Sequence, residues 1–419
     1  MLEQRRMNYA NQLDNQSMSL LFSGFAPVRT ADEFYPFEVN RNFFYLTGID
    51  QENVCLMTLK GQGKIEHYLF IEKIDPIKAL WDGAGLTFEE ASKIALVPVD
   101  HVMNIEVLDT FIAQMLSTTR RALFGAIDTI YLDLERLNEK VPPTFAINFA
   151  QKLSHLYPYL NIRTSQMLLA EMRSSKDNSE IEDIQKAIHI TKVGLERVMK
   201  HLQVGRYEFQ VEAEYNYVLN LHRSSPSFGT IAAMGKNATV LHYRDNASAI
   251  EPDSLVLFDL GCFYNHYCSD ITRTFPATGT FTKRQREVYE VVLDVNKQAI
   301  DFVKPGMTLK EYNEFGKKLL TEGAKKLGLI KEDHEIDKYY YHSLGHYLGL
   351  DVHDVGNYAK PIPEGAILTV EPGLYIAEEG IGIRIEDDIV VRKSGNINLS
   401  KDIIKEVKDI EDYMKKNRK

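Results

Sequence analysis

Five residues in the C-terminal half have types and contexts that suit metal-dependent chemistry. They are Asp259, Asp270, His346, Glu371 and Glu386, in the segments VLFDLG, CSDITRTF, HSLGHYLGLDVHD, TVEPGLY and GIRIEDD. A carboxylate that follows an apolar run is unfavourable inside a protein unless it is paired or bound to a cation. Four such acids therefore indicate a dinuclear site for hard divalent ions rather than scattered surface charge.

The first two acids belong to a predicted β-hairpin, LVLFDLGCFYNHYCSDITRTF. Its first arm begins with an apolar run at residues 255–258, which is typical of a buried strand. Asp259 and Asp270 are eleven residues apart, so a turn near residues 264–266 would place them side by side. Adjacent carboxylates repel unless they share a proton or a cation. The alternative is a pair of turn-capping aspartates, and the other acids favour the metal.

Glu371 and Glu386 repeat this arrangement in AILTVEPGLYI and IGIRIEDDIVV, fifteen residues apart. The alternation around Ile385 places Arg384 and Glu386 on one strand face. We therefore expect Arg384 to support the site or its substrate. The alternative for Glu386 is a charge on a solvated face, since two further acids follow it.

Histidines cluster in the segment HSLGHYLGLDVHD, at His342, His346 and His353. A single histidine is more often structural than functional, but three within twelve positions favour a site. One imidazole as a ligand and others as proton shuttles would suit hydrolysis. Competing motifs are absent from the sequence, including GxSxG, the Walker lysine loop, GxGxxG after a strand and HExxH.

Two pairs of helices precede these strands, and each is predicted from caps and periodicity. Capping boxes are expected at Ser179–Glu182, Thr282–Gln285 and Thr308–Glu311. An apolar stripe runs from Ile181 to Leu202 in the first helix, which is expected to end near Gly205. After each pair come histidines and then two acids on strands. We interpret this as a weak internal duplication whose two halves face a shared site.

The N-terminal part, residues 1 to about 165, has mixed α/β patterning and no visible catalytic constellation. SLLFSGF, NFFYLTGI, VCLMTLK and EHYLFIE are predicted strands, and TFEEASKIALV and NIEVLDTFIAQMLST are predicted helices. Polar turn residues in EMRSSKDN indicate a boundary. We expect domains at residues 1–172 and 173–419.

Composition agrees with a two-domain globular protein of 419 residues. A net charge of -10 argues against a nucleic-acid surface. No apolar run approaches a membrane span, and no signal-peptide core follows the first basic residues. The three cysteines form no CxxC pair, which favours reduced thiols. The cysteines are Cys55, Cys262 and Cys268. We therefore expect a cytoplasmic enzyme.

Taken together, DLG, SDITRTF, HxLGHxxGLDVHD, TVEPGLY and RIEDD resemble the motifs of the pita-bread metallopeptidases, specifically the aminopeptidase P (Xaa-Pro aminopeptidase) family. The stretch RTADEFYPFEVNRNFFYLTG and the LWDG segment are similar to that family's N-terminal domain. The resemblance thus covers nearly the whole chain. It implies an α/β (α+β) fold: an N-terminal creatinase/aminopeptidase P-like α/β domain, involved in oligomerisation and substrate access, followed by a pita-bread catalytic domain. It also implies a homo-oligomer, dimer or tetramer.

The resemblance implies roles for the metal ligands. Asp259 would chelate one ion, Asp270 and Glu386 would bridge both, and His346 and Glu371 would complete the other. Glu371 is also the candidate proton relay.

Other positions match family residues that contact the substrate or lie beside the site: His242 in VLHYRD, His342, His353, Tyr375, Arg384 and Trp81. Trp81 matches a tryptophan that reaches a neighbouring subunit's active site in related oligomers; the alternative is a core or surface-patch residue. Ser343, where relatives often have Gly, and a short loop between Tyr375 and Gly382 depart from the family and bear on loop shape and substrate preference.

The implied activity is release of the N-terminal residue from peptides with proline second. An oxygen-rich ligand set with one histidine suits two Mn²⁺ ions, with Co²⁺ or Zn²⁺ as alternatives. A prolidase restricted to Xaa-Pro dipeptides shares the motifs and stays open. Methionine aminopeptidase does not explain the first 170 residues. A non-catalytic pita-bread binding protein is disfavoured because every ligand position holds a ligand-competent residue.

Overall fold

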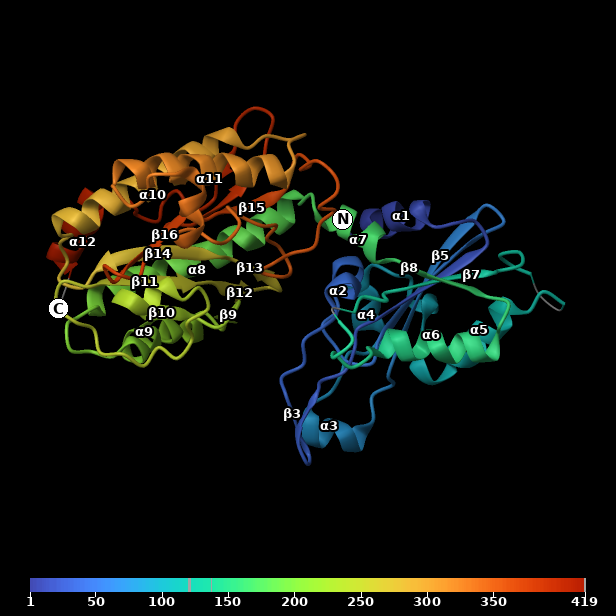
Figure 1. Cartoon of the computed structure of the whole chain (residues 1–419). Helices are drawn as coiled ribbons and strands as arrows, with labels where there is room; N and C mark the ends of the chain where they lie inside the picture. The colour runs from blue at the N-terminus through green and yellow to red at the C-terminus, as the bar shows by residue number, and fades with distance from the viewer. Residues whose placement is uncertain (120–121, 137, 418–419) are drawn as a thin grey trace. The chain divides into compact units, whose positions relative to one another are not determined.

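The computed structural model describes residues 1–119, 122–136 and 138–417, which form two compact units, Met1–Met172 and Arg173–Lys419 (Figure 1). Each unit mixes α-helices with β-strands, as predicted. Within the residues that the structure describes, no helix has both the length and the apolar character required to span a membrane.

The N-terminal unit is built on a six-stranded sheet in the order β6-β5-β4-β1-β7-β8. Strands β1, β4 and β5 pair antiparallel, and the outer pairs are parallel. The strands are β1 (Ser17–Phe22), β4 (Cys55–Gly61), β5 (Lys64–Ile71), β6 (Val102–Asn104), β7 (Thr129–Leu132) and β8 (Asn161–Thr164), with a separate hairpin of β2 (Val28–Thr30) and β3 (Glu33–Phe34). The helices are α1 (Leu2–Gln12), α2 (Arg41–Thr47), α3 (Pro76–Asp82), α4 (Phe88–Ala95), α5 (Leu108–Leu116), α6 (Phe145–Leu156) and α7 (Gln166–Arg173).

The segment NFFYLTGI, predicted as a strand, is helix α2, so that prediction is wrong. The Asn40 side chain accepts a hydrogen bond from the Phe43 amide at 2.9 Å and caps the start of the helix. Gly48 ends it with a φ of 68°, a left-handed conformation that glycine adopts readily. These two caps outweigh the strand preference of the aromatic residues between them, because that preference depends on context.

The other N-terminal predictions agree with the structure more closely. Strands β1, β4 and β5 and helix α4 are confirmed, the last with a capping box at Thr87. The helix predicted in NIEVLDTFIAQMLST begins late, because Ile105–Val107 form a 3₁₀ turn and α5 starts at Leu108.

In the C-terminal unit, strands lie between two groups of helices, α10 and α11 on one side and α8 and α9 on the other (Figure 1). The helices are α8 (Asn178–His201), α9 (Glu208–Leu221), α10 (Lys283–Phe302), α11 (Leu309–Lys326) and α12 (Val407–Asn417). The strands are β9 (Ser225–Pro226), β10 (Ile231–Met234), β11 (Leu255–Leu260), β12 (Cys262–Tyr264), β13 (Tyr267–Cys268), β14 (Ile271–Pro276), β15 (Ile367–Val370), β16 (Gly373–Ile376), β17 (Ile381–Arg384), β18 (Asp387–Val390) and β19 (Ile397–Asn398).

Capping boxes start α8, α10 and α11, and the one at α8 is not where the sequence predicted. Those at Thr282 and Thr308 are confirmed. Helix α8 is capped by Asp177 rather than Ser179: the Asp177 side chain accepts from the Ser179 and Glu180 amides, and Glu180 accepts from the Asp177 amide at 3.0 Å. Aspartate caps as well as serine, so the helix begins earlier. It also ends at His201, before Gly205.

Two antiparallel strand pairs hold the acids that the sequence singled out. Strand β11 pairs with β14, and β15 pairs with β18. In the turn between the first two arms, Asn265 and His266 have φ values of 47° and 68°. A further hairpin joins β16 to β17. A buried apolar cluster formed by residues of α10, α11, β15 and β18 packs the helices against the β15–β18 pair.

Candidate metal centre

Each of the four predicted acids lies at or near the end of a strand. Asp259 is the fifth residue of β11, opposite Thr272 of β14, and Asp270 directly precedes β14. Glu371 lies between β15 and β16, and Glu386 between β17 and β18. Strand ends fix the backbone on one side while leaving the side chain free to face a common point.

His346 is carried by an irregular loop that is bonded to β15. Its carbonyl accepts from the Thr369 amide at 3.0 Å, and its amide donates to the Thr369 hydroxyl at 3.0 Å. A Cβ on Gly345 would lie 2.0 Å from the Thr369 carbonyl oxygen. Only glycine therefore permits this close approach of loop to strand.

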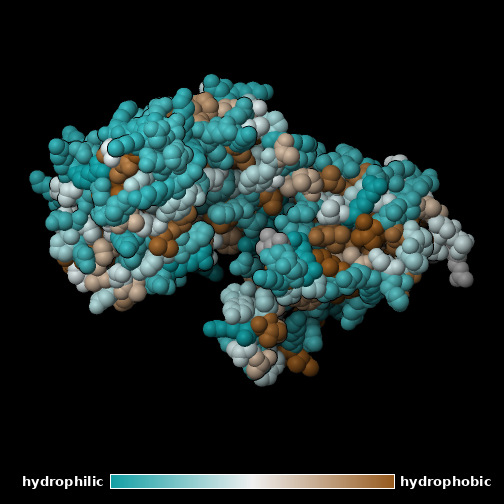
Figure 2. Space-filling view, in the orientation of Figure 1, coloured by the Kyte–Doolittle hydropathy of each residue, from teal (hydrophilic) through white to brown (hydrophobic). Residues whose placement is uncertain are grey.

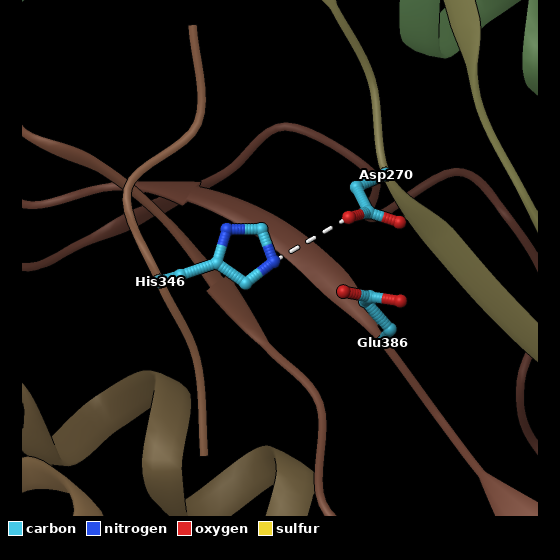
Figure 3. Close-up of side chains that lie close together, drawn as sticks. All are labelled: Asp270, His346 and Glu386. Carbon is cyan, nitrogen blue, oxygen red and sulfur yellow. Dashed lines mark ion pairs between the residues drawn. The ribbon is translucent and has the colours of Figure 1, made fainter. Parts of the chain in front are cut away.

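Three of the five predicted ligands form a tight group. One ligand atom from each of Asp270, His346 and Glu386 lies within 4.8 Å of the others (Figure 3). Nε2 of His346 is 3.5 Å from the Asp270 carboxylate and 3.5 Å from Oε1 of Glu371. The structure thus brings four predicted ligands together from four separate segments.

The orientation of the His346 ring is set by its other nitrogen. Nδ1 lies 2.9 Å from the Tyr347 carbonyl oxygen, which can only accept a hydrogen bond. In the neutral imidazole, Nδ1 then holds the proton and Nε2 presents a lone pair to the carboxylates. That is the arrangement in which an imidazole binds a metal ion.

Asp259, the fifth predicted ligand, lies beside the group but pairs with Arg384. Its carboxylate is 2.5 Å from the Arg384 guanidinium, which also donates to the Tyr375 hydroxyl at 2.9 Å. Nε2 of His342 is 2.8 Å from that hydroxyl, and Nδ1 of His342 is 3.7 Å from Glu371. Arg384, Tyr375 and His342 therefore form a chain of polar contacts from one carboxylate to another.

Two threonines at the centre were not foreseen from the sequence. The Thr272 hydroxyl donates to Glu386 at 2.7 Å and accepts from Nε of Arg384 at 3.0 Å. The Thr369 hydroxyl is 3.3 Å from Glu371 and orients it. The sequence did contain a signal for Thr272. Alternate residues of a strand share a face, so Thr272 in SDITRTF is expected on the same face as Asp270.

The remaining predicted residues are exposed. The ring of His353 packs against that of His346 in a tilted arrangement, with centroids 4.1 Å apart. Partial burial and the neighbouring charges of His346 and His242 lower the pKa of His353. Both His353 and His242 are open to solvent. Trp81 belongs to α3 of the other unit and is 85% exposed, so the core alternative for Trp81 is wrong.

Burial raises the pKa values of three of the site carboxylates, those of Asp259, Glu371 and Glu386. Burial raises the pKa of Asp259 to about 6, against the opposing charge of Arg384, and that of Glu371 to about 7, against His346. Burial and the charge of Asp270 raise the pKa of Glu386 well above its ordinary range. Burial lowers the pKa of His346, but the hydrogen bond to Asp270 and the charge of Glu371 outweigh it and bring that pKa to about 9. The group therefore favours positive charge at its centre.

A second set of buried charges fixes the backbone next to Glu386. Asp387 is fully buried and pairs with Arg273 at 2.7 Å and with Lys405. Arg273 also donates to the Glu386 carbonyl oxygen at 2.5 Å. Asp388 is fully buried as well and accepts from the Asp270 amide at 3.2 Å. A solvated face, the alternative for Glu386, is therefore excluded.

Known proteins are similar to this chain over nearly its whole length. Residues 182–393 match metallopeptidase family M24, and residues 2–124 match the aminopeptidase P N-terminal domain. The Xaa-Pro aminopeptidase of Haemophilus influenzae is 34% identical, over 98% of this chain and 96% of that protein.

Solved structures agree as well. A candidate aminopeptidase P from Bacillus anthracis has a TM-score of 0.96 at 43% identity, covering 100% of this chain and 98% of that one. Zinc-substituted aminopeptidase P of Escherichia coli, in complex with product, has a TM-score of 0.88 at 31% identity, covering 100% and 98%. The predicted fold, an aminopeptidase P-like N-terminal domain and a pita-bread catalytic domain, is confirmed, and the family implies divalent metal ions. The chain therefore belongs to metallopeptidase family M24 and, within it, to the aminopeptidase P group of metallo-aminopeptidases.

Proposed function

We propose that this protein uses two divalent metal ions to release the N-terminal residue from peptides whose second residue is proline. The observation that carries the proposal is the group of Asp270, His346 and Glu386, whose ligand atoms lie within 4.8 Å of one another. Full-length similarity to Xaa-Pro aminopeptidases supports the choice of substrate.

The residues present fit bound cations. Three carboxylates and one imidazole lone pair converge where burial raises the pKa values of the acids. In the described part of the chain, no hydrogen-bond donor reaches Oδ1 of Asp259, although that atom is buried. A buried carboxylate oxygen without a partner is unfavourable, and a cation would satisfy it.

We assign the ligands as the resemblance implied. Asp259 would chelate one ion, His346 and Glu371 would complete the other, and Asp270 and Glu386 would bridge both. Since the set is rich in oxygen and has one nitrogen, Mn²⁺ is the proposed native metal, with Co²⁺ or Zn²⁺ as alternatives.

Ions bound there would polarise the scissile carbonyl and lower the pKa of water toward about 7. The protein groups are proposed to position the peptide and move protons. Glu371, whose carboxylate lies 3.5 Å from Nε2 of His346, would accept a proton and deliver it to the departing nitrogen. That nitrogen is tertiary in proline and has no N–H of its own, so it must be protonated to leave.

Two exposed histidines are proposed to contact the substrate directly. His353 lies beside His346 and His242 lies near His353, so both border the carboxylates from the solvent side. Each would donate a hydrogen bond to a peptide carbonyl or to the oxyanion that forms from it. Arg384, Tyr375 and His342 would line the same region.

A peptide panel tests the activity. The metal-loaded protein should release the first residue from Xaa-Pro-Xaa tripeptides and longer peptides, and should not cleave matched Xaa-Ala-Xaa peptides. Product analysis by mass spectrometry measures this. Cleavage of Xaa-Pro dipeptides alone would identify a prolidase instead, and binding of metal without any cleavage would favour a non-catalytic protein.

We also propose that the protein is a homo-oligomer, a dimer or tetramer, in which the N-terminal domain contributes to assembly and substrate access. Exposed apolar side chains on the β2–β3 hairpin and on α3 support this (Figure 2). Val28 and Phe34 are 64% and 57% exposed, and Ile77, Leu80 and Trp81 are 70%, 85% and 85% exposed. Large exposed apolar side chains are commonly buried at interfaces between subunits.

Replacing Trp81 by Ala is expected to weaken peptide binding and assembly while leaving the metal content unchanged. The side chain is 85% exposed, so its removal should hardly affect the stability of the fold. Light scattering and KM measurements would show the effect. Tyr159→Ala, which removes another exposed aromatic residue of the same unit, is the control. A wild-type monomer that cleaves tripeptides at full rate would exclude an intersubunit role.

A cytoplasmic location is the last part of the proposal. All three cysteines are free and buried, as expected for thiols in a reducing compartment.

A further inference from the structure

His242 lies in a segment with little regular structure, so its position depends on specific side-chain contacts. After β10 comes a short 3₁₀ turn, Gly235–Thr239, and then an irregular stretch up to β11. His242 itself is exposed. An exposed loop residue can serve catalysis only when other groups hold the backbone beneath it.

Glu208, the first residue of α9, makes contacts of this kind with the segment that carries His242. Its side chain is fully buried, and its two carboxylate oxygens accept four hydrogen bonds. Oε1 accepts from the Met234 amide at 2.6 Å and from the Asn237 side chain at 3.1 Å. Oε2 accepts from the Tyr243 hydroxyl at 2.8 Å and from the Ser248 amide at 2.8 Å.

These four donors all belong to the segment that carries His242. They lie on both sides of it, between residues 234 and 248, and one belongs to its immediate neighbour Tyr243. A single carboxylate thus gathers two backbone amides and two side chains of one loop. None of the donors is charged, so a salt bridge does not explain why a glutamate is buried here.

The same loop has further contacts that depend on the start of α9. The Glu208 amide donates to the Ser248 carbonyl at 3.0 Å, and the Phe209 amide donates to the Asn246 carbonyl at 2.7 Å. On the other side, the Tyr341 hydroxyl donates to the Thr239 carbonyl at 2.5 Å. The loop is therefore fixed at its base and at one edge, while His242 projects from the part between them.

We propose that Glu208 is a positioning residue for His242, acting through the loop of residues 234–248. This inference rests on the proposed function, in which His242 contacts the peptide. Glu208 itself has no part in binding metal or substrate. Its carboxylate determines where the loop lies, and the loop determines where the imidazole of His242 can reach.

Glu208→Gln tests this with little change in shape. A glutamine has one oxygen and one NH₂ group, so the NH₂ must face either the Met234 amide or the Ser248 amide. Side-chain partners can rotate to adapt, but these backbone N–H groups cannot. At least one buried donor thus loses its acceptor, and the loop is expected to shift.

The expected result is a fall in kcat/KM of roughly 10- to 100-fold for an Xaa-Pro-Xaa peptide, because misplacing a reacting group by about 1 Å has effects of this order. Metal content and circular dichroism should be unchanged. Hydrogen–deuterium exchange should become faster in peptides covering residues 234–248. In a His242→Ala background, Glu208→Gln should lower the rate further by less than about 3-fold, since both changes remove the same contribution.

Glu180→Gln is the matched control. Glu180 is also buried at the start of a helix and accepts from a backbone amide and a tyrosine hydroxyl, those of Asp177 and Tyr267, outside the 234–248 loop. It should not alter exchange in that loop. If Glu208→Gln does not fold, Tyr243→Phe removes one donor to Glu208, together with the acceptor of the Ala247 amide, and should show the same dependence on His242.

Two results would overturn the proposal: unchanged exchange in residues 234–248, or an equal loss of rate with and without His242. Exchange is measured without a substrate, so it separates this inference from the proposed function. If the unmodified protein does not cleave Xaa-Pro peptides, the proposed function is contradicted. Faster exchange of residues 234–248 in Glu208→Gln would still support the positioning of His242 in that case.

Discussion

Asp270→Asn and Glu386→Gln are each expected to remove metal and peptidase activity together. Both carboxylates are proposed to bridge the two ions, so the loss of one oxygen ligand weakens both sites. Loss of several kcal/mol of transition-state stabilisation corresponds to a fall of about 10³-fold in rate. Elemental analysis of purified protein and a tripeptide assay measure the two effects, and circular dichroism should show the helices intact.

Glu378→Gln is the control for these two variants. Glu378 is a surface acid in the turn between β16 and β17, where it pairs with Lys338 at 2.7 Å. The same chemical change there should leave metal content and activity at their original values. Full activity in Asp270→Asn or Glu386→Gln, or in chelated protein with no detectable metal, would contradict a dinuclear centre.

Replacing individual histidines is expected to separate metal ligands from groups that act on the substrate. His346→Ala should lose metal, because its Nε2 faces Asp270 and Glu371 at 3.5 Å. His353→Ala and His242→Ala should keep metal and lose turnover by on the order of 10²–10³-fold, as expected when a hydrogen bond to a developing oxyanion is removed. Metal content and kcat, measured on the same preparations, distinguish the two classes.

His189→Ala supplies the comparison, because His189 is an exposed histidine of α8 for which we propose no role. It should retain both metal and rate. Less bound metal in His353→Ala than in His346→Ala would reverse the assignment of ligand and substrate contact.

Much of the helical structure could be predicted from the sequence because caps and periodicity act locally. The predicted capping boxes pair Thr282 and Thr308 each with the side chain three residues later in the chain, and both boxes form. At α8, Asp177 caps the helix instead of the predicted Ser179. At α2 the aromatic composition indicated a strand, whereas Asn40 and Gly48 dictate a short helix.

The candidate site was accessible from the sequence for a different reason. A buried acid after an apolar run is costly wherever it occurs, so Asp270 and Glu386 could be recognised without knowledge of the fold. Individual contacts could not be recognised in this way. The contact of Arg384 with Asp259, and the four donors to Glu208, join residues that are distant in sequence, and no local pattern pairs them.

The hydrogen bond from Thr272 to Glu386 joins residues 114 positions apart. Contacts of such separation form late in folding, because a long loop must close before they contribute any stability. The hairpin around Asp270 can form early, but a cation that needs both Asp270 and Glu386 has no binding site until the two halves have met. Metal binding should then slow unfolding more than it accelerates folding, since interactions absent from the transition state act on the unfolding rate. Loss of metal would therefore shorten the lifetime of the folded catalytic unit, in addition to removing its chemistry.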